Sequence, residues 1–132
     1  MKEFHLEVVT PDGQKLDAMV ESLLVRTNDG DAEFLAGHED YMASLGTGRA
    51  RIKIGGENKY ASVSGGFVTV TKDGVKLVAV TFEFREDIDV ERAKSAIEAA
   101  RVAIAEAKDD RALRVAEAKL KRAINRINVA EI

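Results

Sequence analysis

The sequence predicts an α+β protein, with an N-terminal antiparallel β-sandwich in residues 1–84 and a C-terminal antiparallel two-helix hairpin in residues 85–132. Two observations lead to this division. All ten glycines, the only proline and all five phenylalanines precede residue 85, and the remainder contains no glycine, proline or aromatic residue. Apolar residues in that remainder recur at steps of three and four, which is the spacing of one helix face.

Short strands separated by turn residues account for the first part. Phe4, Leu6 and Val8 occupy every second position, which is the period of a half-buried strand. The other predicted strands are Ser22–Arg26, Ala50–Ile54, Tyr60–Val63, Phe67–Val70 and Val75–Thr81. Turns are predicted at Pro11-Asp12-Gly13, Asn28-Asp29-Gly30, Gly55-Gly56 and Lys72-Asp73-Gly74. Short strands at close spacing are typical of sandwiches and barrels. Gly65-Gly66 predicts tight packing or a bulge between strands.

Two helical stripes account for the second part. The first consists of Ala93, Ile97, Ala100, Ile104 and Ala107, and the second of Leu113, Ala116, Leu120, Ala123 and Ile127. Asp109-Asp110 lies between the stripes, where it suits an N-cap and a first-turn acid for the second helix. The short break favours an antiparallel hairpin. The hairpin has few large aliphatic residues, so their burial barely offsets the conformational entropy lost when the hairpin becomes ordered. We therefore expect a marginally stable, movable element.

Composition excludes several functional classes. The chain has no cysteine, which rules out disulfides and thiol chemistry and fits a reducing compartment. No apolar run approaches the length of a membrane span, and a net charge of −3 does not demand nucleic acid. His5 and His38 are too few for a metal site and are expected to be structural or surface residues. The serines have no triad motif and there is no phosphate loop, so we expect no enzymatic activity.

Charge is distributed unevenly between the two parts. Residues 1–84 contain nine Lys and Arg against thirteen Asp and Glu, whereas residues 85–132 contain eleven against ten. From Arg111 onward there are six basic residues and two acidic ones. The second helix is therefore predicted to be a cationic rod.

The start of the first helix has an unusual residue at its third position. Asp89 is a suitable N-cap, and Ile88 and Ala93 then occupy the positions of a small hydrophobic staple. A capping box would place Glu or Gln where Arg92 stands, and a cation opposes the positive end of the helix dipole. We therefore expect Arg92 to have an anionic partner, either a carboxylate or a phosphate.

Arg122 and Arg126 are four residues apart, so they share one face of the second helix. A pair of guanidinium groups can clamp a phosphate chain through forked hydrogen bonds. The alternative is an ordinary solvated face.

Five segments, in order along essentially the whole chain, resemble the epsilon subunit of bacterial F-type ATP synthases. They are Val8–Gly13, Gly37-His38, Val63–Val70, Glu86–Ala93 and Leu120–Ile127. The resemblance implies a central-stalk component of a proton-translocating synthase, on the cytoplasmic face of the cell membrane as a peripheral part of the F1 complex. It implies that the sandwich packs on the gamma subunit and the c-ring, without direct membrane insertion. The tail would extend into the alpha3beta3 hexamer and hinder ATP hydrolysis.

The same resemblance implies a regulatory nucleotide rather than a catalytic cofactor. ATP, alone or with Mg²⁺, would bind and stabilise the folded tail. The implied ATP-binding residues are Glu83, Ile88, Asp89, Arg92, Ala93, Arg122 and Arg126, with Arg101 as an additional candidate. Contacts to the catalytic subunits would come from Arg111, Arg114, Lys119 and Lys121. The isolated chain is expected to be monomeric. A different interpretation is a free-standing β-sandwich binding module whose hairpin mediates dimerisation.

Overall fold

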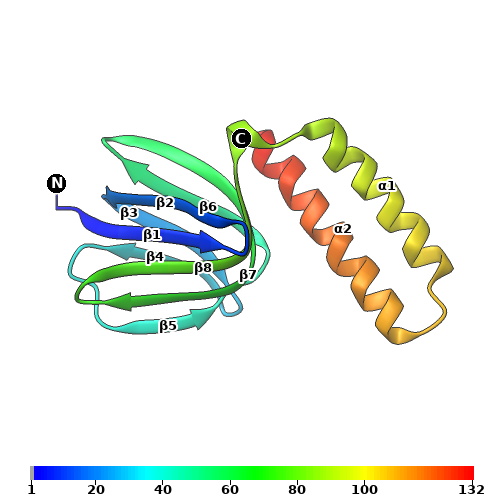
Figure 1. Cartoon of the computed structure of the whole chain (residues 1–132), viewed down its shortest axis with the longest axis horizontal. Helices are drawn as coiled ribbons and strands as arrows, with labels where there is room; N and C mark the ends of the chain where they lie inside the picture. Colours follow the sequence, from blue (N-terminus) through cyan, green and yellow to red (C-terminus); the bar gives the residue numbers. More distant parts are fainter. Residues whose placement is uncertain (1) are drawn as a thin grey trace. The chain divides into compact units, whose positions relative to one another are not determined.

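The computed structural model describes residues 2–132, which form eight strands, one 3-10 turn and two α-helices (Figure 1). The strands are β1 Phe4–Thr10, β2 Gly13–Val20, β3 Ser22–Thr27, β4 Gly30–Leu35, β5 Tyr41–Ser44, β6 Gly48–Ile54, β7 Glu57–Thr71 and β8 Gly74–Phe84. The 3-10 turn is η1 Arg85–Asp87, and the helices are α1 Val90–Glu106 and α2 Asp110–Ala130. Contacts divide the chain into two compact units that meet between Phe84 and Arg85, and each is described by itself.

Seven strands of the sandwich follow the order β2-β1-β8-β7-β6-β3-β4, and β5 pairs with β7. Every pair is antiparallel except β1 with β8, which run parallel with Leu6 opposite Val75. The parallel pair joins the first strand to the last. The local apolar pattern of a strand does not show in which direction a distant strand pairs with it, so the parallel pairing could not be predicted from the sequence.

The sandwich has a core of aliphatic side chains with one fully buried aromatic ring. Leu6 and Val8 of β1 are 0% exposed, which confirms the predicted alternation along this strand. Leu23, Phe34, Ile52, Val68 and Leu77 contribute further buried side chains from five other strands. The first unit thus has a hydrophobic core of its own.

Strand β7 differs from the prediction of two separate strands at Tyr60–Val63 and Phe67–Val70. It is continuous over Glu57–Thr71, with its first half paired to β6 and its second half to β5. Gly65 and Gly66 lie at this change of partner, with φ angles of 70° and 92°. The register against β8 is the same on both sides of the pair, so no residue is inserted there. The glycines permit a close approach between strands, as one of the two predicted alternatives proposed.

Strands β2, β4 and β5 were not predicted. Most of their residues are exposed or half-buried, and Tyr41–Ser44 has no buried residue. Strands are recognised in a sequence by the alternation of apolar and polar residues. A strand that buries few side chains lacks this alternation and is therefore missed.

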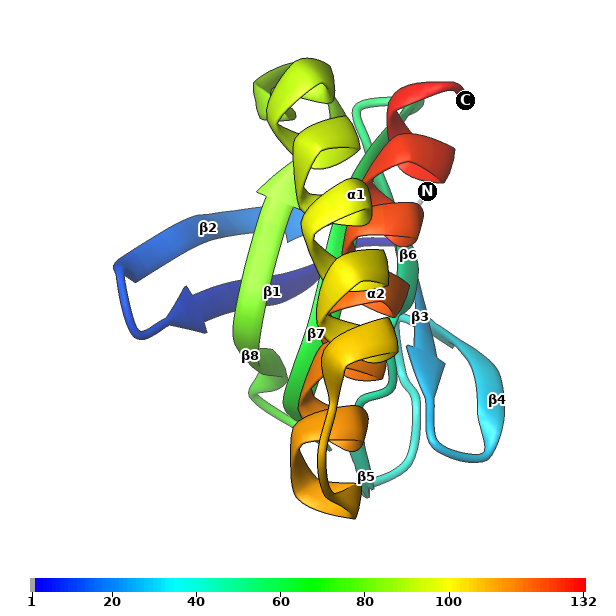
Figure 2. The ribbon, with the colours of Figure 1, turned by 90° about the vertical axis from the view of Figure 1, so that its right-hand side faces the viewer.

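The hairpin unit confirms both predicted stripes. All ten stripe residues are buried or half-buried, and the four alanines Ala93, Ala100, Ala116 and Ala123 are at most 3% exposed. Figure 1 shows α1 and α2 next to each other, and in Figure 2 α1 lies in front of α2 along most of its length. The large aliphatic residues of the stripes are only half-buried, so the seam between the helices consists mainly of small side chains. Alanine lets the backbones approach closely but contributes little apolar area, which agrees with a marginal hairpin.

Asp109 caps α2 as predicted. Its Oδ1 atom accepts a hydrogen bond of 2.7 Å from the backbone N–H of Ala112, and its backbone is extended. Asp110 is the first residue of the helix, where a carboxylate complements the helix dipole. Among residues 2–132, neither helix combines the length and apolarity needed to cross a bilayer.

Candidate functional site

The predicted nucleotide residues of the hairpin lie at its open end. Because α1 and α2 are antiparallel and joined through residues 107–109, the start of α1 and the end of α2 lie at the opposite end from this connection (Figure 1). Asp89 and Arg92 belong to the start of α1, and Arg122 and Arg126 to the second half of α2. The fold therefore brings these four residues to one end of the hairpin.

Asp89 caps α1, as predicted. Its Oδ1 atom accepts a 3.0 Å hydrogen bond from the backbone N–H of Arg92. Ile88, the residue before Asp89, is 9% exposed, and Ala93, four residues after Asp89, is 1% exposed. Buried apolar side chains therefore lie on either side of the cap along the chain. The Asp89 side chain itself remains exposed. The start of α1 is thus capped by a side chain whose carboxylate also faces solvent.

Arg92 is exposed, and its guanidinium forms no ion pair with any carboxylate of residues 2–132. Of the two anionic partners predicted for Arg92, the carboxylate is therefore not present among the ion pairs of the described residues. The nearest charged pair on α1, Glu91 with Lys94 at 3.7 Å, leaves Arg92 out. A phosphate remains the predicted alternative.

Arg122 and Arg126 are both half-buried, one turn apart on α2. Partial burial lowers the local dielectric and limits the conformations of a long side chain, so each hydrogen bond to a bound anion is stronger than on a free surface. Their positions flank Ala123, which is 0% exposed. The half-burial of both side chains differs from the fully solvated face that was the alternative prediction.

Two of the predicted residues lie elsewhere. Glu83 belongs to β8 in the sandwich unit, where it stands opposite Ser62 of β7. Arg101 is exposed on α1 nine residues beyond Arg92, which corresponds to about 13 Å along the helix axis. The structure therefore does not bring Arg101 together with the residues at the open end.

The four residues predicted to meet catalytic subunits are all exposed on α2. Arg111, Arg114, Lys119 and Lys121 form no ion pairs with other residues of the described chain, 2–132. Their positive charge is therefore not neutralised within the hairpin. Such a surface attracts an acidic partner, and the attraction weakens as salt is added.

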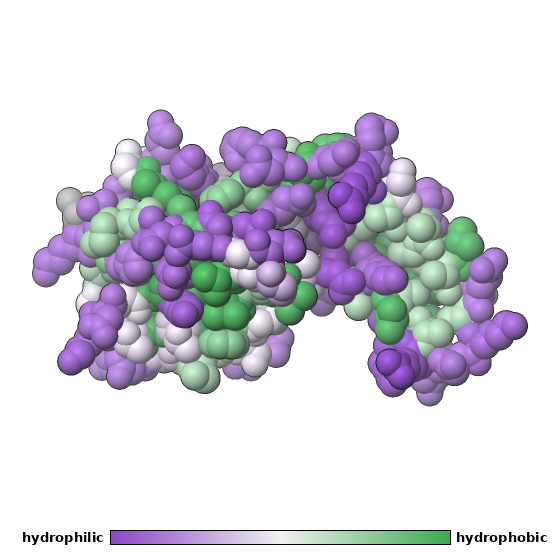
Figure 3. Space-filling view, in the orientation of Figure 1, coloured by the Kyte–Doolittle hydropathy of each residue, from purple (hydrophilic) through white to green (hydrophobic). Residues whose placement is uncertain are grey.

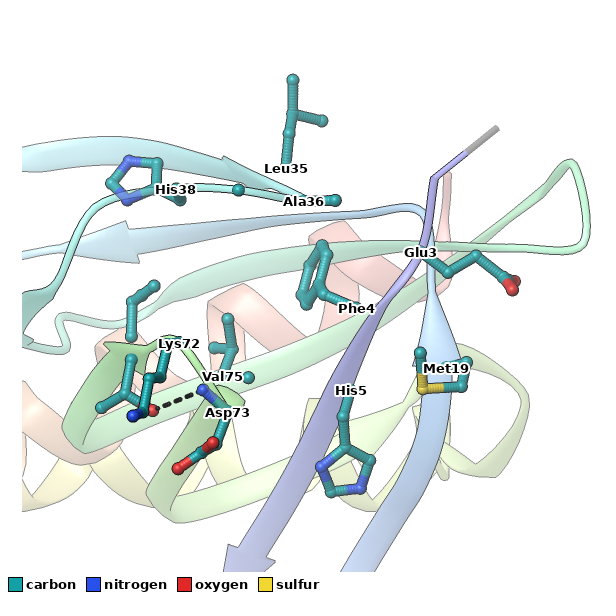
Figure 4. A pocket seen from close by; sticks show the side chains of 14 residues that line it. Glu3, Phe4, His5, Met19, Leu35, Ala36, His38, Lys72, Asp73 and Val75 are labelled. Carbon is teal, nitrogen blue, oxygen red and sulfur yellow. Dashed lines mark hydrogen bonds between the residues drawn. The ribbon is translucent and has the colours of Figure 1, made fainter.

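A pocket of about 300 Å³ on the sandwich was not predicted (Figure 4). It is formed by the start of β1, the end of β2, the β4–β5 loop and the β7–β8 turn. Met19 and Leu35 line it and are 50% and 56% exposed. Lys72 and Asp73 add charge of both signs. No local pattern in the sequence indicates the pocket, because its lining residues come together only through pairing between distant strands.

His38 belongs to this pocket and supports its loop. Its ring lies 5.1 Å from that of Phe34 in an edge-on arrangement and 6.2 Å from that of Tyr41. Its Nδ1 atom lies 2.8 Å from the carbonyl oxygen of Glu39. His5 pairs with Asp17 across β1 and β2. Both histidines therefore take part in local packing and pairing, in agreement with the structural role predicted for them.

Apolar side chains also reach the surface of the sandwich outside the pocket. Figure 3 shows hydrophobic areas interspersed with hydrophilic ones over the strands. Met42 is 70% exposed, Val80 60% and Phe67 40%. These residues belong to β5, β8 and β7 respectively.

The fold and these surfaces define a class of protein: a β-sandwich with exposed apolar residues, joined to a helical hairpin whose second helix carries exposed cations. Residues 3–85 match the family model described as the ATP synthase Delta/Epsilon chain, beta-sandwich domain. Residues 86–131 match the model described as the ATP synthase Delta/Epsilon chain, long alpha-helix domain. The chain belongs to the ATP synthase epsilon chain family.

Curated relatives carry the same description over the full length. The ATP synthase epsilon chain of Bacillus velezensis is 42% identical over 130 residues, which cover 98% of both chains. The corresponding chain of Bacillus subtilis is also 42% identical, over 98% of each chain. A relative from Propionigenium modestum, 34% identical over 99% of this chain and 96% of its own, is described as sodium ion specific. Family membership therefore does not establish which ion is coupled.

Solved structures agree. A chain in the Euglena gracilis mitochondrial ATP synthase, OSCP/F1/c-ring, superposes with a TM-score of 0.80 at 28% identity, covering 93% of this chain and 78% of that one. A chain of the Tetrahymena thermophila enzyme, with a TM-score of 0.65 at 12% identity over 98% and 97% of the two chains, shares the fold.

These matches confirm the predicted resemblance to the F-type epsilon subunit and the predicted absence of catalytic function, since family members are subunits of the synthase. The interpretation as a free-standing binding module is not supported. The chain is a non-catalytic subunit concerned with ATP synthesis and ion transport.

Proposed function

We propose that the chain is a regulatory rotor subunit, whose sandwich joins gamma to the c-ring and whose hairpin is a mobile tail that inhibits ATP hydrolysis. The observation that carries this proposal is the contrast between the two units. The sandwich has a core of large, fully buried side chains, whereas the hairpin seam is built on four buried alanines. An element with so little buried apolar area can leave its folded state at modest cost, while the sandwich stays intact.

Attachment to the rotor is supported by the surface of the sandwich. Its exposed apolar residues and its pocket offer contact areas, and the similar Euglena chain was solved in an assembly that includes F1 and the c-ring. The chain would then lie as a peripheral subunit at the cytoplasmic face of the membrane, coupled to proton movement. The isolated chain should be monomeric, with a mass near 14.4 kDa in light scattering. A stable dimer would argue against this arrangement.

Inhibition is assigned to the extended hairpin. When the two helices leave their folded state, the uncompensated charges of α2 become available to the alpha3beta3 hexamer. Arg111, Arg114, Lys119 and Lys121 would then contact acidic surface on the catalytic subunits. The binding energy of several such contacts would offset the loss of the small hairpin seam.

Replacing all four of these cations by glutamine should weaken the inhibition. In a gamma-containing catalytic complex reconstituted with the full chain, we expect the variant to release ATP hydrolysis about tenfold relative to the parent at low salt, since each charge contact contributes a fraction of a kcal/mol. The difference should shrink as salt is raised. Lys15→Gln with Lys59→Gln, two exposed cations of the sandwich, is the matched control. Equal hydrolysis by variant and parent at all salt concentrations would exclude these contacts.

ATP is assigned to the folded hairpin as a regulatory ligand. The unpaired guanidinium of Arg92, the cap at Asp89 and the half-buried pair Arg122 and Arg126 converge on the open end. Arginines at this end can hold the phosphates, alone or with Mg²⁺, through charge-assisted hydrogen bonds. Ile88 and Ala93 would complete the site around the base. ATP bound here would favour the folded, non-inhibitory tail.

A further inference from the structure

At the open end of the hairpin, η1 and the end of α2 are joined by contacts that do not depend on a nucleotide. An antiparallel helix pair is tied covalently only where its connection lies, so its other end should fray first. In this chain the connection is the segment 107–109, and the unconnected end contains the 3-10 turn η1 and the last turn of α2. These two segments contact each other.

Arg85 provides the polar part of this contact. Its Nη1 atom donates a hydrogen bond of 2.9 Å to the backbone carbonyl oxygen of Ile132, which lies 47 residues further along the chain. Its Nη2 atom lies 3.4 Å from Glu86 Oε1, which restrains the guanidinium from the other side. Ile132 lies just beyond the end of α2, so the Arg85 cation stands close to the negative end of the helix dipole and opposes it.

Val129 is a branched apolar side chain buried in the last turn of α2, the helix that contacts η1. It is 1% exposed, and among the hairpin residues it is the one that ranks with the largest fully buried side chains of the described chain. Ile88, directly after η1, is 9% exposed. Along the rest of the hairpin the fully buried positions are alanines, so branched side chains are buried only at this end.

We propose that η1 and the last turn of α2 form a clasp, made by Arg85, Ile88 and Val129, that closes the hairpin at its unconnected end. Opening of the tail then begins with release of this clasp and proceeds toward the connection. Because Asp89 and Arg92 follow the clasp and Arg122 and Arg126 precede it, the clasp also fixes the distance between the two halves of the nucleotide site. That last consequence rests on the function proposed above, whereas the clasp itself does not.

The test uses the full chain without nucleotide, so its result is independent of ATP binding. Amide hydrogen exchange is measured residue by residue by NMR in the parent, in Arg85→Met, which keeps the stem but removes the donors, and in Val129→Ala. Both variants should speed exchange in the last two turns of α2 about tenfold, with an effect that declines toward Leu113, while the sandwich strands keep their parent rates.

Two controls separate the clasp from general weakening of the hairpin. Val102→Ala and Arg111→Met remove an apolar side chain that is 55% exposed and an exposed cation, both far from the unconnected end. Each should leave exchange in the last two turns of α2 within about twofold of the parent. Unchanged exchange at the end of α2 in both clasp variants, or an equal acceleration along the whole of α2, would overturn the proposal.

Discussion

Replacing Gly66 by alanine is expected to destabilise the sandwich by at least about 3 kcal/mol, a loss large enough to unfold a marginal domain. Gly66 has a φ of 92°, which an alanine adopts only with strain. An added Cβ would also lie 1.8 Å from the carbonyl oxygen of Val78 in β8. Backbone cannot move aside as a flexible side chain can, so β7 and β8 would have to separate. Chemical denaturation of the full chain, followed by tyrosine fluorescence, measures the loss.

Gly55→Ala is the matched control for this effect. Gly55 also has a positive φ, 56°, but an added Cβ would meet nothing within 4 Å. It therefore carries the conformational strain without the collision, and we expect a cost of about 1 kcal/mol. If Gly66→Ala were no more costly than Gly55→Ala, the close approach of β7 and β8 would not contribute to the stability of the sandwich.

The second large effect concerns ATP. Thermal unfolding of the hairpin should shift upward with ATP, since a ligand at 100 times its dissociation constant stabilises the state it binds by about 2.7 kcal/mol. Combining Asp89→Ala with Arg92→Ala should abolish this shift, because it removes both the carboxylate and the guanidinium at the start of α1. Far-ultraviolet circular dichroism and calorimetric titration of the full chain follow the two quantities.

The double variant loses both the helix cap and the proposed ATP contacts, so the two effects on stability are measured separately. Asp89→Ala alone should lower the stability of the hairpin by about 1 kcal/mol without ATP. Asp89→Asn keeps a capping side chain and removes the charge. Arg101→Ala removes an exposed arginine from the same helix, about 13 Å from Arg92, and should retain the full ATP shift. A shift that persists in the double variant, or one that disappears in Arg101→Ala, would contradict the position assigned to the site.

Local sequence patterns predicted the elements that bury a regular set of side chains. The alternation through Leu6 and Val8, the stripes of the two helices and the caps at Asp89 and Asp109 are all present. In each case a few residues close together in sequence decide the outcome, either by burying one face of the element or by capping the first N–H groups of a helix. Such requirements are visible without knowledge of the rest of the fold.

Features that depend on distant parts of the chain were not predictable in this way. The parallel pairing of β1 with β8, the continuity of β7 through Gly65 and the pocket beside Leu35 all require strands far apart in sequence to meet. Arg92 was expected to pair with either a carboxylate or a phosphate, and the sequence could not choose between them. Among residues 2–132, no carboxylate forms an ion pair with Arg92. Binding of a phosphate by Arg92 is tested by the ATP experiment above.

The central claim is that a weakly closed hairpin, whose folded state ATP favours, is attached to a sandwich that is stable by itself. Hydrogen exchange of the full chain by mass spectrometry, with and without millimolar ATP, tests it most directly. We expect helix amides to exchange at least about a hundredfold faster than those of β7 and β8 without nucleotide, and to slow about tenfold when ATP is added. Helices as protected as these strands, and indifferent to ATP, would contradict the claim.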